Sequence, residues 1–294
     1  VVNCSDAVRA PPDAAISYCQ LHHIPWVEMG AEAHATGRLM SLPTLGAPLV
    51  LGAGVFPGWS TSLAHHLVQS LPTTVEELHV GVRISPLSGA GPANCELMTH
   101  MLEAPSLRVQ EGHIVEGPPL AGTRKLIYAG DAEATYTEVG LPDAHLLAHL
   151  TEAPHITTSL AVSPGILRYN FRLLATLTAW AGPLRPVMRW VTRWLLRLSR
   201  GLLLRNVESP VHLTASAHAG GKTEVALLAF PEGREATALG VAAVVDALLA
   251  RETPLVPGTY TCAEIEPLPQ LLRRAHKLRE PGRSGEFVVV RSGD

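Results

Sequence analysis

The first thirty residues contain two short apolar segments separated by a segment of helical composition. Residues 1–4 and 24–29 suit buried strands, and residues 11–23 suit a helix with a proline near its start. A strand, a helix and a second strand in so short a stretch predict a βαβ unit with two parallel strands. A parallel sheet that is covered on both faces needs more strands than these two. The chain begins with Val1 and not with methionine, so we expect the missing strands to precede it and the sequence to be a fragment.

The composition excludes several classes of protein. The 294 residues are 47% hydrophobic and 17% charged, which is typical of a folded chain with one large or two ordinary domains and excludes a disordered tail or a coiled coil. The net charge of −3 excludes a globally basic protein, so we expect no nucleic-acid partner. No signal-peptide pattern is present and the four cysteines are scattered, which favours a cytoplasmic protein with reduced thiols.

Hydrophobic periodicity predicts the remaining elements. We expect helices at 60–71, 143–150, 236–250 and 268–278, strands at 75–84, 155–161 and 258–263, and hairpins at 107–117 and 211–231. The predicted fold class is α/β, with the tail of a Rossmann-type parallel sheet in residues 1–57. A larger α+β domain, for substrate binding or dimerisation, is expected in residues 58–294, with Arg-rich helices at 166–205.

A glycine-rich segment, LGAGVFPG at 51–58, follows an apolar strand and precedes a helix. Such a segment can bind a dinucleotide phosphate at the helix N-terminus. The third glycine is one position late for that motif, Pro57 stiffens the turn, and the next strand ends in Arg83 and not in the expected acid. A tight turn between strand and helix, or the wall of an active site, are the other two interpretations.

Two segments resemble the saccharopine dehydrogenase-like NAD(P)-binding oxidoreductases. VVNCSDAVRAPPDAAISYCQLHHIPWVEMGAE at 1–32 is similar to the closing βαβ unit of their nucleotide domain, and GAGVFPGWSTSLAHHL at 52–67 is similar to the segment that leads into their second domain. VEELHVGVRISP and PGTYTCAEIEPL extend the similarity more weakly. The G-x-G-x-x-G loop of this family would precede Val1, so the resemblance implies a piece without the phosphate-binding half.

The resemblance implies that NADP or NAD is the cofactor of the full-length protein. It places cofactor contacts at two strand ends and one turn, namely Asn3, Cys4, Ser5, Met29, Gly30, Glu32, Val55, Phe56, Pro57 and Gly58. Asp6 and Ala7 stand where many relatives carry Gly-Pro, and no residue presents itself as the catalytic acid or base. A small-molecule or lipid-like substrate and a homodimer are expected, and we expect these 294 residues alone to bind the dinucleotide poorly.

An arginine-rich segment suggests a different function. Arg185, Arg189, Arg193 and Arg197 recur every fourth residue and would form one stripe on a helix, bordered by Trp190 and Trp194. Such a helix suits peripheral contact with an anionic membrane surface or an acidic partner. A non-catalytic membrane-surface or scaffold protein that uses the helix at 185–200 is therefore the alternative function. A helix packed on the domain, with its arginines solvated or paired, would show the same pattern.

The fourteen histidines give no strong metal motif. His145 and His149 are four residues apart and could share a zinc ion on one helix face. The glutamate of H-E-x-x-H and a third ligand are missing, which favours a partly exposed helix face and no metal site. His100 would serve as a general base only if it faced a cleft.

Overall fold

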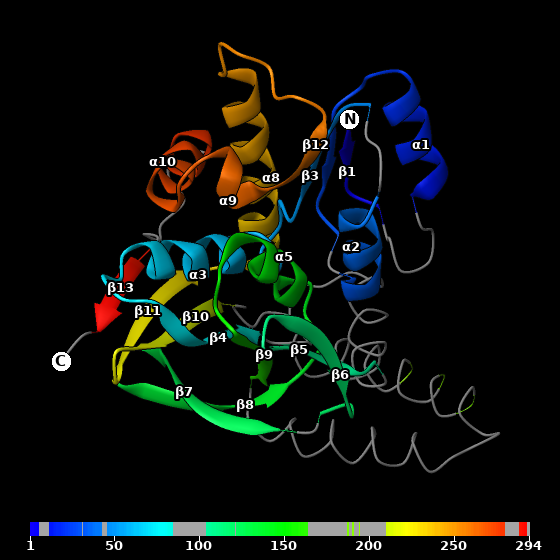
Figure 1. The fold of residues 1–294 in the computed structure, drawn as a ribbon. Helices are drawn as coiled ribbons and strands as arrows, with labels where there is room; N and C mark the ends of the chain where they lie inside the picture. Colours follow the sequence, from blue (N-terminus) through cyan, green and yellow to red (C-terminus); the bar gives the residue numbers. More distant parts are fainter. Residues whose placement is uncertain are drawn as a thin grey trace.

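The computed structural model describes residues 1–5, 12–30, 32–42, 46–84, 104–120, 122–163, 187, 190, 194, 210–279 and 288–292. Within these residues the chain is an α/β protein with a small parallel sheet, a larger mixed sheet and helices that pack against both (Figure 1).

The parallel sheet contains four strands among the described residues, in the order β1-β2-β3-β12. The strands are β1 (Val2–Asn3), β2 (Trp26–Glu28), β3 (Pro48–Leu51) and β12 (Gly258–Thr261). Helix α1 (Asp13–Leu21) joins β1 to β2, which confirms the predicted strand, helix and parallel strand. Helix α2 (Ala33–Met40), which the sequence analysis did not predict, joins β2 to β3.

The pairing of β12 with β3 brings two distant parts of the chain together. The sequence analysis placed all residues after 57 in a second domain, yet residues 258–261 pair in parallel with residues 48–51. The parallel sheet therefore takes its fourth described strand from near the other end of the chain.

The mixed sheet contains nine strands among the described residues, in the order β13-β11-β10-β4-β9-β5-β6, with β8 paired to β9 and β7 paired to β8. The strands are β4 (Val75–Ile84), β5 (Ser106–Gln110), β6 (His113–Gly117), β7 (Thr123–Ala129), β8 (Ala132–Glu138), β9 (His155–Val162), β10 (Val211–Ala219), β11 (Lys222–Phe230) and β13 (Val288–Ser292). Strands β4 and β9 are parallel, and the other described pairs in this sheet are antiparallel.

Most elements agree with the periodicity of the sequence. The predicted helices at 143–150 and 268–278 are α5 (Asp143–Leu150) and α10 (Leu268–Leu278), and both predicted hairpins are present. The β10–β11 turn places Gly220 and Gly221 at φ of 58° and 77°, the backbone conformation for which two-residue hairpin turns favour glycine. The described part also includes α3 (Trp59–Gln69), α8 (Gly233–Leu249) and α9 (Cys262–Ile265).

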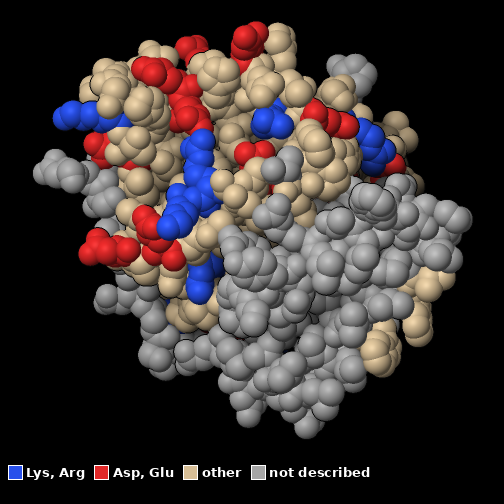
Figure 2. Space-filling view, turned by 90° about the horizontal axis from the view of Figure 1, so that it is seen from below, with Lys and Arg blue, Asp and Glu red and all other residues tan. Residues whose placement is uncertain are grey.

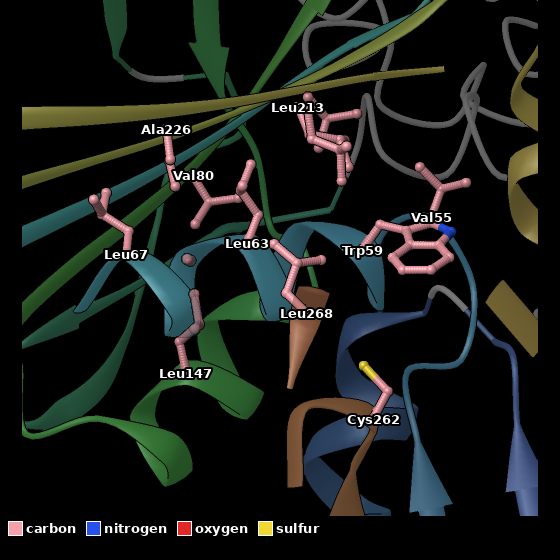
Figure 3. Packing of buried hydrophobic residues seen from close by; sticks show 14 of the residues in the cluster. Val55, Trp59, Leu63, Leu67, Val80, Leu147, Leu213, Ala226, Cys262 and Leu268 are labelled. Atoms are coloured by element: carbon pink, nitrogen blue, oxygen red, sulfur yellow. The ribbon is translucent and has the colours of Figure 1, made fainter. Parts of the chain in front are cut away.

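Helix α3 lies at the centre of the described structure. It packs against β4, β10 and β11 of the mixed sheet and touches α5, α9 and α10 on its other sides. Leu63 and Leu67 are fully buried there against Val80 of β4 and Leu213 of β10 (Figure 3). Alternate residues of each strand point to α3, and the residues between them point to the second face of the sheet.

The β7–β8 hairpin covers part of this second face. The Thr214 hydroxyl of β10 donates a hydrogen bond of 2.8 Å to the backbone oxygen of Ile127 in β7. A Cβ atom on Gly81 of β4 would lie 2.8 Å from the Tyr136 ring of β8, so glycine allows the hairpin to approach. No helix in the described residues is long and apolar enough to cross a membrane.

Candidate functional site

The strands of the parallel sheet end together at one edge, because all of them run in the same direction. Asn3 ends β1, Glu28 ends β2, and the glycine turn 52–58 follows β3. In open sheets of this kind, ligands bind in the crevice outside the carboxyl ends of the strands. The structure thus brings the three predicted groups of site residues to one edge, which we call the carboxyl edge.

The Glu28 carboxylate connects the ends of β1 and β2. Its side chain is only 5% exposed and accepts hydrogen bonds from Asn3 Nδ2 (2.8 Å), Trp26 Nε1 (3.1 Å) and the Gly30 backbone N–H (2.7 Å). These bonds satisfy a buried charged group and fix the backbone where the chain leaves the sheet. Sequence analysis did not single out Glu28, although an acid at the end of an apolar strand was a usable signal.

The predicted residues of β1 differ in their surroundings. The Asn3 side chain also accepts bonds at Oδ1 from the Ser5 N–H (3.1 Å) and the Ser5 hydroxyl (2.7 Å), so both ends of its amide serve to shape the chain. Cys4 carries a free, exposed thiol. Asn3 is therefore a positioning residue, while Cys4 and Ser5 present side chains at the surface of the carboxyl edge.

After β2, the predicted site residues are Met29, Gly30 and Glu32. Met29 donates its N–H to the Asn3 carbonyl (3.3 Å), and Gly30 follows with no side chain. Glu32 is the N-cap of α2, where its carboxylate accepts the N–H groups of His34 (2.9 Å) and Ala35. A carboxylate at a helix N-terminus stabilises the helix, so the observed contacts of Glu32 are those of a cap.

The glycine segment is a tight turn from strand to helix. A Cβ atom on Gly58 would lie 2.0 Å from the Gly54 carbonyl oxygen, and Gly58 has φ of 140°. The first N–H groups of α3, on Trp59 and Ser60, already bond to the carbonyls of Gly54 (3.1 Å) and Val55 (3.0 Å). These two groups are not free to bind a phosphate, so of the three interpretations the geometry favours the tight turn.

Helix α8 closes the outer side of this turn. Gly240 lies so near that its Cβ would be 2.7 Å from the Ala53 carbonyl oxygen, and the Trp59 indole donates a bond of 2.9 Å to the Ala236 carbonyl. Val55 lies beside Trp59 in the core (Figure 3). Of the four predicted residues in the turn, Val55, Pro57 and Gly58 are buried and Phe56 is half-buried.

A small cavity lies between the turn and the helices around it. Its volume is about 10 Å³, about the space that one water molecule needs. The turn glycines, Ser62, Gly240 and Cys262 are among its lining residues. Burial raises the pKa of the Cys262 thiol to about 12, so this thiol is protonated at neutral pH and is no nucleophile.

Asp143, the first residue of α5, is a fully buried acid that contacts the start of α3. Its Oδ1 accepts hydrogen bonds from the hydroxyls of Ser60 (2.6 Å) and Thr61 (2.8 Å), and its Oδ2 has no hydrogen-bond partner among the described residues. Burial raises the pKa of this carboxyl, and the two hydroxyl bonds counteract only part of that effect. Sequence analysis did not single out Asp143, because its hydrogen-bond partners lie more than 80 residues away in the chain.

The histidines that the structure describes lie in separate surroundings. His145 packs against Gly37 of α2, and burial, together with the neighbouring His34, lowers its pKa. His149 is on α5 as well but faces Glu264 of α9, with 3.5 Å between His149 Nε2 and Glu264 Oε1. Among the described residues no three metal-ligating side chains come together. His100 lies outside the described residues.

The sequence matches no protein-family model and no curated protein. The resemblance to saccharopine dehydrogenase-like enzymes therefore rests on the sequence of the segments at 1–32 and 52–67.

We predict that Asp143 makes the folded protein less stable as the pH rises. Because its pKa is raised in the folded state, the folded protein keeps this proton at pH values where the unfolded chain has lost it. The contribution of Asp143 to the free energy of unfolding therefore decreases above the ordinary pKa of 3.8. Asp143→Asn cannot ionise, so its stability relative to the wild type should increase as the pH rises from about 4 to neutral.

Urea unfolding at a series of pH values measures this difference. Asp131→Asn, at an exposed position between β7 and β8, is the matched control. A stability difference between Asp143→Asn and the wild type that stays constant over the pH series would show that the buried carboxyl does not act in this way.

Proposed function

We propose that the protein is an NAD(P)-dependent oxidoreductase of the saccharopine dehydrogenase-like type, acting in the cytoplasm on a small-molecule or lipid-like substrate. The parallel sheet belongs, in this proposal, to a Rossmann-type domain. The observation that carries the proposal is the meeting of the two family-like segments at the carboxyl edge, where dinucleotides bind in such domains. Ala53 donates its N–H to the Glu28 carbonyl (3.2 Å), so the turn and the end of β2 are in direct contact.

The residues at this edge suit the nicotinamide end of the cofactor. Gly30 leaves the backbone accessible, and the half-buried side chains of Met29 and Phe56 offer apolar surface beside it. Met29 lies over the turn, since its Cγ would be 3.4 Å from a Cβ on Gly54. We infer that these three residues orient the nicotinamide ring and exclude water from one side of it, while the bound cofactor supplies the hydride.

The pyrophosphate would have to bind elsewhere, because the first amides of α3 are bonded within the turn. The carboxyl edge supports a role in positioning, and we assign no catalytic acid or base to it.

Substitution of Gly30 tests this proposal. The full-length protein should bind NADPH or NADH in a calorimetric titration, and Gly30→Val should weaken that binding by about tenfold or more, because the new side chain fills the space beside Met29.

Gly258→Val, at the first residue of β12 and so at the opposite edge of the same sheet, is the control and should bind as the wild type does. Absence of binding of both cofactors to the full-length protein, or equal binding by Gly30→Val, would overturn the proposal.

A second candidate function, contact with a membrane surface, is supported by three exposed apolar side chains. Val187, Trp190 and Trp194 are helical, are spaced by three and four residues, and are 55%, 65% and 49% exposed. This spacing places them on one face of a helix. Arg185, Arg189, Arg193 and Arg197 lie outside the described residues. Tryptophan side chains are favoured at membrane interfaces.

The described residues on one face of the molecule carry mixed charge. Figure 2 shows a short row of basic side chains with acidic side chains beside it, and no wide basic surface among the described residues of that view. Membrane contact through this helix would therefore depend on the tryptophans and on residues 185–200 themselves.

Flotation with anionic liposomes tests the membrane proposal. The wild type should float with the vesicles, and the double variant Trp190→Ala, Trp194→Ala should lose most of this association because it removes the apolar contact area. Leu249→Ala removes an apolar side chain that is 81% exposed at the last residue of α8, and it should change nothing. Wild-type protein that stays at the bottom of the gradient would refute membrane contact.

A further inference from the structure

The second face of the mixed sheet carries a row of polar side chains beneath the β7–β8 hairpin. His79 and Arg83 of β4 point to this face, as do His212 of β10 and Ser159 of β9. The face lies opposite α3 and the glycine turn, so it is not part of the carboxyl edge.

The two ends of this row differ in charge. At one end Glu77 and Arg124 form an ion pair, with 2.5 Å between Glu77 Oε1 and Arg124 Nη2. At the other end stands Arg83, next to the last residue of β4. Its guanidinium donates hydrogen bonds to the Ser163 hydroxyl (3.0 Å) and to His212 Nδ1 (3.5 Å), and its central carbon lies over the Tyr128 ring, 4.1 Å from the ring centre.

All the contacts that the described residues make with the Arg83 guanidinium are to neutral groups. Burial, and Arg83 itself, lower the pKa of His212, so the imidazole is neutral at pH 7. Arg274, another partly buried arginine, is held by the carboxylates of Glu266 and Asp246. Arg83 has no carboxylate among the described residues, although a guanidinium can donate five N–H groups and prefers an oxyanion.

The Arg83 guanidinium is partly accessible, and three neighbouring side chains fix its orientation. Arg83, Tyr128, Ser163 and His212 are each half-buried. The Tyr128 and His212 rings pack edge to face, with 5.1 Å between their centres. Tyr128 therefore contacts both Arg83 and His212. A guanidinium that is stacked on an aromatic ring keeps the edges of its planar fork free for a ligand.

We propose that Arg83, Ser163, His212 and Tyr128 form a binding site for the carboxylate of a small organic acid. The guanidinium would bind the two carboxylate oxygens, the Ser163 hydroxyl would add a donor, and Tyr128 would contact the apolar part of the ligand. One positive charge with two neutral polar neighbours matches a monoanion better than a phosphate dianion. The inference does not depend on the proposed oxidoreductase function, because it concerns the other face of the sheet.

Titration with benzoate, followed by the ¹⁵N NMR signal of the Arg83 side chain, tests the site in the wild-type protein. Benzoate should shift this signal in a saturable manner. Arg83→Gln should weaken benzoate binding by about tenfold or more, and Arg83→Lys, which keeps the charge but not the fork, should give an intermediate affinity.

Arg124→Gln is the matched control, since it removes an arginine from the other end of the same face, and it should bind benzoate as the wild type does. Equal binding by Arg83→Gln, or no shift of the Arg83 signal up to the solubility limit of benzoate, overturns the proposal. Tighter binding of inorganic phosphate than of benzoate at Arg83 overturns the assignment to a carboxylate.

Discussion

The close contact of Gly54 and Gly58 determines how the rest of the structure is connected. Because the Gly54 carbonyl occupies the place of a Gly58 side chain, the chain passes from β3 into α3 through the compact turn 52–58. Helix α3 then enters the core of the mixed sheet, and α8 packs on the turn through Gly240. This turn thus connects the parallel sheet to the mixed sheet at a point where Gly54, Gly58 and Gly240 leave no room for side chains.

The same close packing determines where a ligand can bind. Hydrogen bonds within the turn occupy the first amides of α3, and the adjoining cavity has room for little more than one water molecule. Outside the turn, the carboxyl edge is accessible at Cys4 and Ser5 and at the half-buried Met29 and Gly30. Glu28 accepts three hydrogen bonds beside them. The glycine segment 51–58 resembles a phosphate loop in sequence. Its contacts are better explained as those of a tight turn that packs on the end of β2, where Ala53 bonds to Glu28.

The sequence allowed the local elements to be predicted but not their long-range partners. Periodicity identified α5 and α10 to the residue, because each has a regular apolar stripe. It missed α2, which depends on the Glu32 cap and carries a glycine in its middle. The pairing of β12 with β3, more than 200 residues away, has no local signal.

The candidate site was predictable to a similar extent. Asn3, Met29 and Gly30 were expected from their positions at strand ends, where the structure places them. Glu28 and Asp143 were missed because burial and distant hydrogen-bond partners, and not a local pattern, define their surroundings. The arginines from 185 to 197 lie outside the described residues, so their stripe stays a prediction.

The central claim is that the nicotinamide ring of a bound cofactor lies at Met29. The most direct measurement is the nuclear Overhauser effect between nicotinamide protons and ¹³C-labelled methionine methyl groups in the complex of the full-length protein with NADPH. The chain has five methionines, and Met40, at the end of α2, is an internal reference. The account predicts contacts from the nicotinamide to the Met29 methyl group and none to Met40. Nicotinamide contacts to another methionine, with none to Met29, would contradict it.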